Sequence, residues 1–239
     1  IIDLGNKETD LRVFPNLEDL SSAAAEIFLK LLKSDGENRF IVPGGSTPRL
    51  FYRYLADKVL DWTGVTLIPS DERLVDENSP ESNIGMIREN LIGRINKKDK
   101  PTLFSFIDRI NRSRSDQALS SLKAKLTQLL PPKATFLGIG QDGHTASLFP
   151  GYDELDFDTE PSLLIKRDSD PFQRVSISTT FLANTPRLVF LVSGERKRTV
   201  IKKIVTNNKN IDHLQVMKII KMATGRVTFL CDQDAVPYD

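Results

Sequence analysis

Residues 134–150 read ATFLGIGQDGHTASLFP, an apolar run followed by a glycine-rich turn. The run from Ala134 to Ile139 lacks the alternation of apolar and polar residues that a half-exposed strand shows. Such a strand is buried on both faces, which is typical of a parallel sheet covered by helices. The turn that follows contains Gly140 and Gly143 and places His144 just beyond the predicted strand.

Similar apolar runs alternate with helical patterns on both sides of this stretch. The other predicted strands are 39–42, 65–68, 162–165, 175–178, 188–192 and 227–231. The predicted helices, in which apolar residues recur every three or four positions, are 17–32, 50–60, 83–95, 118–130, 196–205 and 214–222. We expect the last two helices to separate the last three strands. The pattern predicts an α/β fold with a mostly parallel central sheet flanked by helices.

Length and charge bound the class of protein. A chain of 239 residues can bury a substantial core, and no repeat or linker divides it, so we expect a single α/β domain over residues 1–239. The 33 basic and 32 acidic residues nearly cancel, which leaves no long-range field to attract nucleic acid or an anionic membrane. Any anion site must be a local cluster. We expect a small-molecule ligand and, by default, a monomer.

Cysteine content and hydropathy bear on the cellular setting. The single cysteine, Cys231, cannot form an intrachain disulfide, and its apolar surroundings favour a buried strand residue. No basic segment followed by a long apolar run opens the chain, and no uncharged apolar stretch approaches the ~18 residues of a membrane helix. These features predict a cytoplasmic protein without a membrane partner.

Three segments directly follow predicted strands and carry unusual chemistry: 44–48, 69–73 and 140–145. In parallel α/β sheets, ligands bind in crevices beyond the carboxyl ends of the strands. We therefore expect the functional site where these three segments meet.

The first segment is suited to bind phosphate. Gly44 and Gly45 permit close approach of the backbone, and Ser46 or Thr47 could cap a helix that begins at Pro48. Free amides, the helix dipole and two hydroxyl groups would then face an anion. The Gly-Lys-Ser/Thr of a Walker A loop is absent. A tight turn with a helix cap explains the same residues.

The second segment places Asp71, Glu72 and Arg73 immediately after a strand. A solvated turn could hold three charged residues. In the functional interpretation, Arg73 binds a substrate anion through its planar fork, and one carboxylate contacts sugar hydroxyls or another site residue. Which of Asp71, Glu72 and Asp142 contacts the substrate stays open.

The third segment contains a candidate for proton transfer. His144 follows a strand, lies in a glycine-rich turn and is close in sequence to Asp142, as a general base acting near neutral pH requires. The other histidine, His213, falls in a predicted helix, and we interpret it as structural.

The same segment matches the dinucleotide-binding pattern GxGxxG through Gly138, Gly140 and Gly143. That pattern requires a long helix next, whereas Pro150 and Gly151 stop any helix after roughly two turns. A GxSxG elbow and an HExxH zinc helix are absent, and two distant histidines with one strand cysteine are poor metal ligands. We expect no metal and no organic cofactor.

The three segments, in this order, resemble the 6-phosphogluconolactonase family. The resemblance runs from about residue 15 to residue 205. The matching stretches are 44–48, 71–73 with 82–83 after it, 138–150 and, more weakly, 174–178 with 194–197. It implies a Rossmann-like three-layer sandwich that hydrolyses 6-phosphogluconolactone to 6-phosphogluconate in the pentose phosphate pathway.

Related deaminases and isomerases share this superfamily and offer an alternative. Glucosamine-6-phosphate deaminases carry a similar Gly-x-Gly-x-Asp-Gly-His turn but then usually read Phe-Asn-Glu-Pro after the His and Ala. This chain has Ser147-Leu148-Phe149-Pro150, so the deaminase's catalytic Glu is missing. Departures from the lactonase pattern include Pro43 before the glycines and a divergent C-terminus, in which only residues 232–235 are similar. The C-terminal contribution to the site is therefore open.

Our hypothesis gives His144 the role of general base toward the attacking water and then of acid toward the leaving ring oxygen. Asp142 would orient the imidazole, and Arg73 or an amide of the glycine turn would stabilise the oxyanion. The proposed substrate contacts, of which Arg174 and Lys197 come from the resemblance, are Gly44, Gly45, Ser46, Thr47, Asp71, Arg174 and Lys197. A non-catalytic sugar-phosphate sensor is the alternative from another class.

Overall fold

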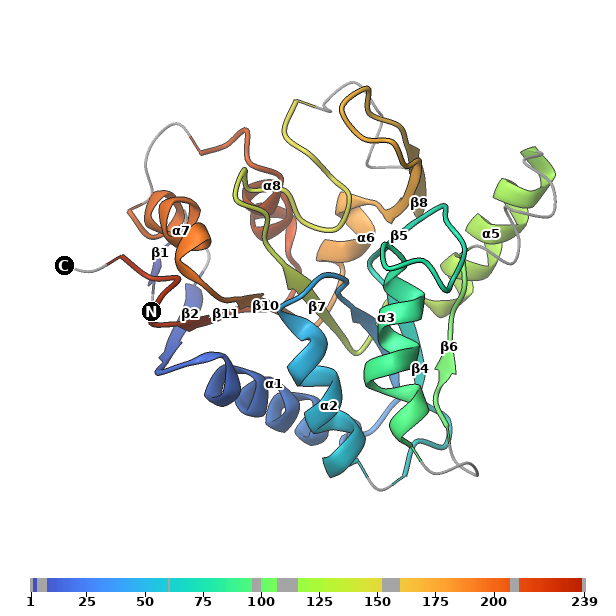
Figure 1. Cartoon of the computed structure of the whole chain (residues 1–239), viewed down its shortest axis with the longest axis horizontal. Coiled ribbons are helices and arrows are strands. Elements are labelled where there is room, and N and C mark those ends of the chain that lie inside the picture. Colours follow the sequence, from blue (N-terminus) through green and yellow to red (C-terminus); the bar gives the residue numbers. More distant parts are fainter. Residues whose placement is uncertain are drawn as a thin grey trace.

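The computed structural model describes residues 2–3, 8–59, 61–95, 100–106, 116–151, 160–206 and 211–237. These residues form a large sheet of eight strands, a small sheet of three strands, and helices on both faces of the large sheet (Figure 1). In the ranges described, no helix is both long enough and apolar enough to cross a membrane.

The large sheet is parallel except at one edge. Only the β1–β2 pair is antiparallel, and every other pair of neighbours runs in the same direction. The strands, in order across the sheet, are β1 (Ile2–Asp3), β2 (Glu8–Phe14), β11 (Arg226–Asp232), β10 (Arg187–Val192), β7 (Ala134–Gly138), β3 (Arg39–Val42), β4 (Thr66–Pro69) and β6 (Thr102–Leu103). The predicted parallel sheet is confirmed.

Helices cover both faces of this sheet and give the predicted three layers. One face packs against α1 (Leu17–Leu32), α2 (Pro48–Lys58) and α3 (Asn83–Asn90). The other face packs against α5 (Asp116–Leu129), α6 (Thr179–Ala183), α7 (Arg198–Val205) and α8 (Gln215–Met222). Two 3₁₀ turns, η1 (Ile92–Arg94) and η2 (Glu195–Lys197), lie next to α3 and α7.

The central strands are apolar on both faces because each face meets a separate core. In β10, Phe190 joins the cluster beneath α5 to α8, whereas its neighbours Val189 and Leu191 join the cluster beneath α1 to α3. The second cluster is rich in aromatic rings, and the centroids of Phe51 and Phe136 lie 5.3 Å apart. Each large buried side chain of this kind stabilises the fold by roughly 1.5–3 kcal/mol.

A small antiparallel sheet stands beside the carboxyl ends of the parallel strands. Its strands, in order, are β5 (Asp71–Arg73), β9 (Arg174–Ile177) and β8 (Ser162–Ile165). Residues 71–73 therefore form a strand and not the loop that the sequence indicated, because their backbone pairs with β9. The predicted strands 162–165 and 175–178 exist close to those bounds, but they lie outside the parallel sheet.

Several predicted boundaries change. The α-helix predicted for 83–95 ends at Asn90, because Leu91 leaves the helical region at φ −126° and a 3₁₀ turn follows. The helix predicted for 196–205 is η2 followed by α7, and the helix predicted for 50–60 spans 48–58, with residue 60 outside the described ranges. Both α7 and α8 lie between β10 and β11, while the short α6, which the sequence did not reveal, separates β9 from β10. His213 is exposed in a turn before α8 and is not helical.

Glu72 fixes the start of α3 to β5. Its side chain is fully buried, and one carboxylate oxygen accepts the amide hydrogens of Asn83 at 2.9 Å and Arg73 at 2.7 Å. The other oxygen accepts from the amide of Ile84 at 2.7 Å and from the Ser82 hydroxyl at 3.1 Å. A carboxylate at a helix N-terminus satisfies orphan amides and interacts favourably with the helix dipole. Glu72 is therefore a structural anchor.

Replacing Glu72 by Ala should lower the free energy of unfolding by about 2 kcal/mol, because buried amides of α3 lose their acceptor. Urea denaturation, with the midpoint and slope both measured, tests this expectation. Glu81→Ala is the matched control: it removes an exposed carboxylate two residues before the helix and should change stability by less than about 0.5 kcal/mol. Equal effects of the two substitutions would contradict the anchoring role.

Candidate active site

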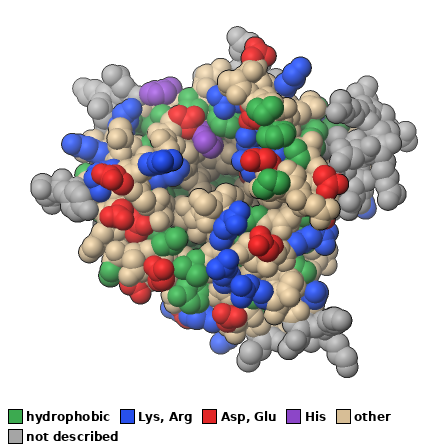
Figure 2. All heavy atoms as spheres, viewed as in Figure 1, with side chains coloured by type: hydrophobic (Ala, Val, Ile, Leu, Met, Phe, Trp, Pro, Cys, Tyr) green, Lys and Arg blue, Asp and Glu red, His purple; other side chains and the backbone are tan. Residues whose placement is uncertain are grey.

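A cavity of about 880 Å³ opens at the carboxyl ends of β3, β4, β7 and β10. The three segments singled out from the sequence meet there, as expected from the parallel topology, and residues 193–197 from the end of β10 join them. Figure 2 shows histidine, basic and acidic side chains around a hollow on this face. The cavity lies between the large sheet and the small one.

His144 and Asp142 form a close pair on the cavity wall. The Nδ1 atom of His144 lies 2.5 Å from Oδ1 of Asp142, and the same oxygen accepts the backbone amide hydrogen of His144 at 3.2 Å. Both side chains line the cavity, and that of His144 is 32% exposed. With Nδ1–H donated to the carboxylate, Nε2 carries the lone pair of the neutral imidazole. The turn thus presents a basic nitrogen.

The surroundings keep this imidazole neutral near physiological pH. Burial lowers the pKa of His144, the charges of Asp142 and Asp71 raise it, and Lys197 lowers it, with the net result below the ordinary histidine value. For Asp142, burial raises the pKa, but the charge and hydrogen bonds of His144 outweigh that effect and lower it overall. The pair therefore consists of an ionised carboxylate and a neutral imidazole over a wide pH range.

Two glycines of the turn are needed for different reasons: Gly140 for the space that it leaves, and Gly143 for its backbone conformation. A Cβ at Gly140 would overlap the imidazole of His144 and approach Asp142. Only glycine at this position therefore leaves room for the two side chains to pack against the backbone. Gly143 has φ +81°, which favours glycine, and its Cβ would press on Leu214. Residues 141–151 form turns and bends with no helix. Of the three glycines that match the dinucleotide pattern, Gly140 is thus the one that makes room for the imidazole.

Asp71 is a second carboxylate on the cavity wall. It is 5% exposed, and its two oxygens accept from the hydroxyls of Ser70 at 2.9 Å and Ser147 at 2.5 Å. The backbone amide of Ser147 in turn donates a hydrogen bond to the Ser176 hydroxyl oxygen at 3.2 Å. Asp71 and Asp142 line the cavity, whereas Glu72 does not. The sequence did not reveal that Ser147 and Ser176 support Asp71, because both lie far from it along the chain.

Arg73 and Arg174 lie opposite each other in the β5–β9 pair, and both line the cavity. Arg73 donates through Nη1 to Oδ1 of Asn83 at 3.0 Å and to the Glu81 carbonyl at 3.2 Å. Arg174 holds Asp170 with two nitrogens, at 2.8 Å from Nε and 2.6 Å from Nη2. Asp170 therefore neutralises much of the charge of Arg174 and leaves Arg73 as the freer cation of the two.

The first segment, residues 44–48, does not cap α2 in the way that the sequence predicted. Neither Ser46 nor Thr47 caps α2 with its side chain: Thr47, the N-cap residue, already has helical angles (φ −55°, ψ −44°), whereas a capping residue is typically extended. Gly45, at φ +92°, turns the chain just before this helix. A Cβ at Gly44 would overlap the Asn83 side chain. The two hydroxyls therefore stay free of the helix and line the cavity.

The C-terminal segment contributes indirectly. Asp232, at the end of β11, accepts the Gly194 amide hydrogen at 3.0 and 3.1 Å on its two oxygens, and it also accepts from the Ser193 hydroxyl. Gly194 begins the turn that carries Lys197. Burial lowers the pKa of Lys197, and the charge of Asp142 acts in the opposite direction. Asp232, which lies on the strand next to β10, thus fixes the turn that carries Lys197.

Phe149 and Arg167 are site residues that the sequence did not identify as such. The ring of Phe149 lies 4.6 Å from the imidazole of His144, centroid to centroid, and the guanidinium carbon of Arg167 lies 3.8 Å from the Phe149 centroid. Among the residues described, no group of three His, Cys, Asp or Glu side chains could hold a metal ion.

Comparisons with known proteins find relatives over most of the chain. A 6-phosphogluconolactonase of Caulobacter vibrioides is 33% identical over 233 residues, covering 92% of this chain and 96% of the relative. The structure of 6-phosphogluconolactonase from Trypanosoma brucei superposes with a TM-score of 0.79 at 23% identity, covering 96% of this chain and 98% of that one. A monomeric glucosamine-6-phosphate deaminase superposes almost as well, with a TM-score of 0.78 at 19% identity over 95% and 98% of the chains.

These structural neighbours share the fold, and the deaminase among them shows that the fold alone does not select the reaction. The sequence profile of the family described as "Glucosamine-6-phosphate isomerases/6-phosphogluconolactonase" matches residues 15–228. The chain belongs to the glucosamine-6-phosphate isomerase/6-phosphogluconolactonase family.

Proposed function

We propose that this protein hydrolyses 6-phospho-D-glucono-1,5-lactone to 6-phospho-D-gluconate, the second step of the oxidative pentose phosphate pathway. The His144–Asp142 pair on the cavity wall carries this proposal, because ester hydrolysis requires a base for water. The curated relatives named as 6-phosphogluconolactonases support the substrate class. The cytoplasmic location and the monomeric state stay predictions from the sequence.

In the first step, water attacks the lactone carbonyl carbon while Nε2 of His144 takes a proton from it. The imidazolium is stabilised by Asp142, whose carboxylate receives Nδ1–H. The tetrahedral intermediate then collapses, the bond between the carbonyl carbon and the ring oxygen breaks, and the imidazolium returns its proton to that oxygen. The new carboxylic acid releases its own proton to solvent, and His144 is neutral again.

The oxyanion of the intermediate needs a hydrogen-bond donor, and Arg73 supplies one in this proposal. Its guanidinium lines the cavity and has no carboxylate partner among the residues described. One preorganised donor of this kind is worth on the order of 10²- to 10³-fold in rate. We assign the hydroxyls of Ser46 and Thr47, which also line the cavity, to the phosphate end of the substrate.

Phe149 argues against deamination. In the sequence pattern of the deaminases, a catalytic Glu stands at the position that Phe149 occupies here, and the ring packs directly against His144. An aromatic ring cannot transfer protons, and it adds to the burial that lowers the imidazole pKa. With one carboxylate contacting its imidazole, His144 is suited to activate water rather than to share proton transfers with a second acid.

Replacing His144 by Asn should lower kcat roughly 10²- to 10⁴-fold, because the asparagine amide cannot accept a proton from water. The lactone can be made in place by oxidation of glucose 6-phosphate, and its opening followed against a no-enzyme control, since such lactones also open spontaneously. Near-wild-type turnover by the variant would eliminate His144 as the base. Ammonia release from glucosamine 6-phosphate by the wild type would instead support the deaminase, and binding of 6-phosphogluconate without turnover would support the sensor.

The kcat/KM profile of the wild type should fall on the acid side with a midpoint below the ordinary histidine value of about 6.5. The sign follows from the lowered pKa: the active, neutral imidazole persists below pH 6.5 and is lost as pH falls through the lowered value. Asp142→Asn removes a charge that raises this pKa, so the midpoint should move to still lower pH while kcat falls. A midpoint above 6.5 in the wild type would contradict a buried, neutral base.

Gly140→Ala should lower kcat by at least about tenfold, because the new Cβ overlaps the imidazole and a small displacement of a catalytic group is costly. Gly138→Ala is the matched control, since a Cβ there meets nothing within 4 Å. Steady-state kinetics and thermal melting of both variants separate catalysis from folding. Two variants with equal activity would show that the close approach of Gly140 to His144 has no catalytic importance.

A further inference from the structure

Arg167 is a cation of the cavity that no motif identified. It follows β8, lines the cavity, and stacks on the face of Phe149 with its guanidinium carbon 3.8 Å from the ring centroid. The backbone carbonyl of Arg167 accepts the Asp170 amide hydrogen at 3.2 Å, which closes the turn after β8. The side chain is therefore placed by a ring and a turn.

Arg167 differs from the other cations of the cavity in its charge partners. In the part of the chain that the structure describes, no carboxylate lies within ion-pair distance of its guanidinium. Arg174, in contrast, is bound by Asp170 through two nitrogens, and Lys197 feels the charge of Asp142. Arg167 thus has more uncompensated charge than either residue that the family resemblance suggested for the phosphate.

Stacking also leaves its hydrogen-bond donors free. A guanidinium that lies flat on an aromatic face points its N–H groups outward in its own plane, where they do not contact the ring. The contact of the guanidinium carbon with the ring, at 3.8 Å from the centroid, restricts the side chain in advance, so that less side-chain freedom is lost when an anion binds. A planar fork with free donors matches two oxygens of a phosphate group.

We propose that Arg167, oriented by Phe149, is a principal contact for the phosphate group of the substrate. This inference rests on the proposed function and assigns the phosphate of the lactone to a residue outside the family motifs. The same ring touches His144, so Phe149 also fixes the distance between the general base and the phosphate contact. Phe149 is in this sense a positioning residue that relates the two ends of the substrate.

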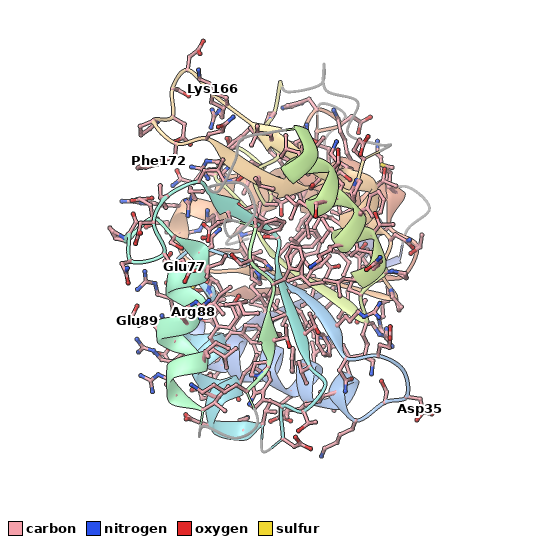
Figure 3. The ribbon with its side chains drawn as sticks, turned by 90° about the vertical axis from the view of Figure 1, so that its right-hand side faces the viewer. Asp35, Glu77, Arg88, Glu89, Lys166 and Phe172 are labelled. Atoms are coloured by element: carbon pink, nitrogen blue, oxygen red, sulfur yellow. The ribbon has the colours of Figure 1, made fainter. Side chains whose placement is uncertain are left out.

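The first test compares Arg167→Ala with Lys166→Ala. Lys166 is the preceding residue, has the same charge, is exposed and points away from the body of the protein (Figure 3). Arg167→Ala should raise KM for the lactone and Kd for 6-phosphogluconate by about 10- to 100-fold, the range of one or two charged hydrogen bonds, with kcat changed less than about threefold. Lys166→Ala should leave all three constants within twofold of wild type.

A second test uses Phe149→Leu and Arg167→Lys. Phe149→Leu should raise Kd for 6-phosphogluconate several-fold in the wild type and much less in the Arg167→Ala background, because the ring is in closer contact with the guanidinium carbon of Arg167 (3.8 Å) than with that of Arg174 (5.6 Å). Arg167→Lys should restore only part of the affinity, since a lysine keeps the charge without the planar fork. Additive losses in the double variant, or a Kd for Arg167→Ala equal to wild type, would overturn the inference.

Calorimetric binding of 6-phosphogluconate keeps this test separate from the proposed activity. If the wild type binds the product and Arg167→Ala does not, Arg167 contacts the phosphate even in a protein without turnover. If the wild type hydrolyses the lactone and Arg167→Ala matches it in KM, the lactonase function holds and the role of Arg167 is refuted. A loss of kcat with unchanged KM would also refute a phosphate contact, because it would place Arg167 at the reacting carbonyl.

Discussion

The parallel pairing of β7 with β3 and β10 is the constraint on which the site depends. Strands that run in the same direction end at the same edge, so three loops from distant parts of the chain reach one cavity. The loop after β3 supplies free hydroxyls, the loop after β7 supplies His144, and the turn after β10 supplies Lys197. Both faces of these strands are buried beneath helices, which makes the edge rigid and leaves chemistry to the loops.

Asp71 and Glu72 show how a strand divides two neighbouring carboxylates between different tasks. Successive side chains of a strand point to opposite faces, so Asp71 reaches the cavity while Glu72 turns toward the start of α3. Burial raises the pKa of Glu72, the charge of Asp71 adds to this, and three backbone amides act in the opposite direction. Anchoring α3 also places Asn83, which accepts from Arg73 and packs over Gly44. Structural and functional carboxylates are thus adjacent in sequence and linked through one helix.

The sequence revealed those features that depend on local pattern. Unbroken apolar runs identified the parallel strands, and the glycine turn identified His144 and its close partner Asp142. Features that depend on pairing between segments distant in sequence were not predicted. For example, β5 looked like a charged loop because only its pairing with β9 makes it a strand. β2, whose polar residues alternate weakly with Leu11 and Val13, was missed for a similar reason. Arg167 was passed over because its partner is a ring 18 positions away, and no spacing encodes such a contact.

The charge distribution reconciles an almost neutral chain with an anionic substrate. The register of β5 and β9 sets Arg73 against Arg174, an unfavourable pair that Asp170 relieves: it forms an ion pair with Arg174, and its charge also interacts with that of Arg73. Positive charge therefore accumulates locally. Because the basic and acidic residues of the whole chain nearly cancel, an anion site has to depend on such a local excess. The same charge would suppress the basicity of a nearby imidazole, since Lys197 already lowers the pKa of His144. Asp142, at 2.5 Å from Nδ1, offsets that effect within the pair. In the proposed mechanism, a carboxylate dedicated to the base is thus what allows one cavity to attract a dianion and still activate water.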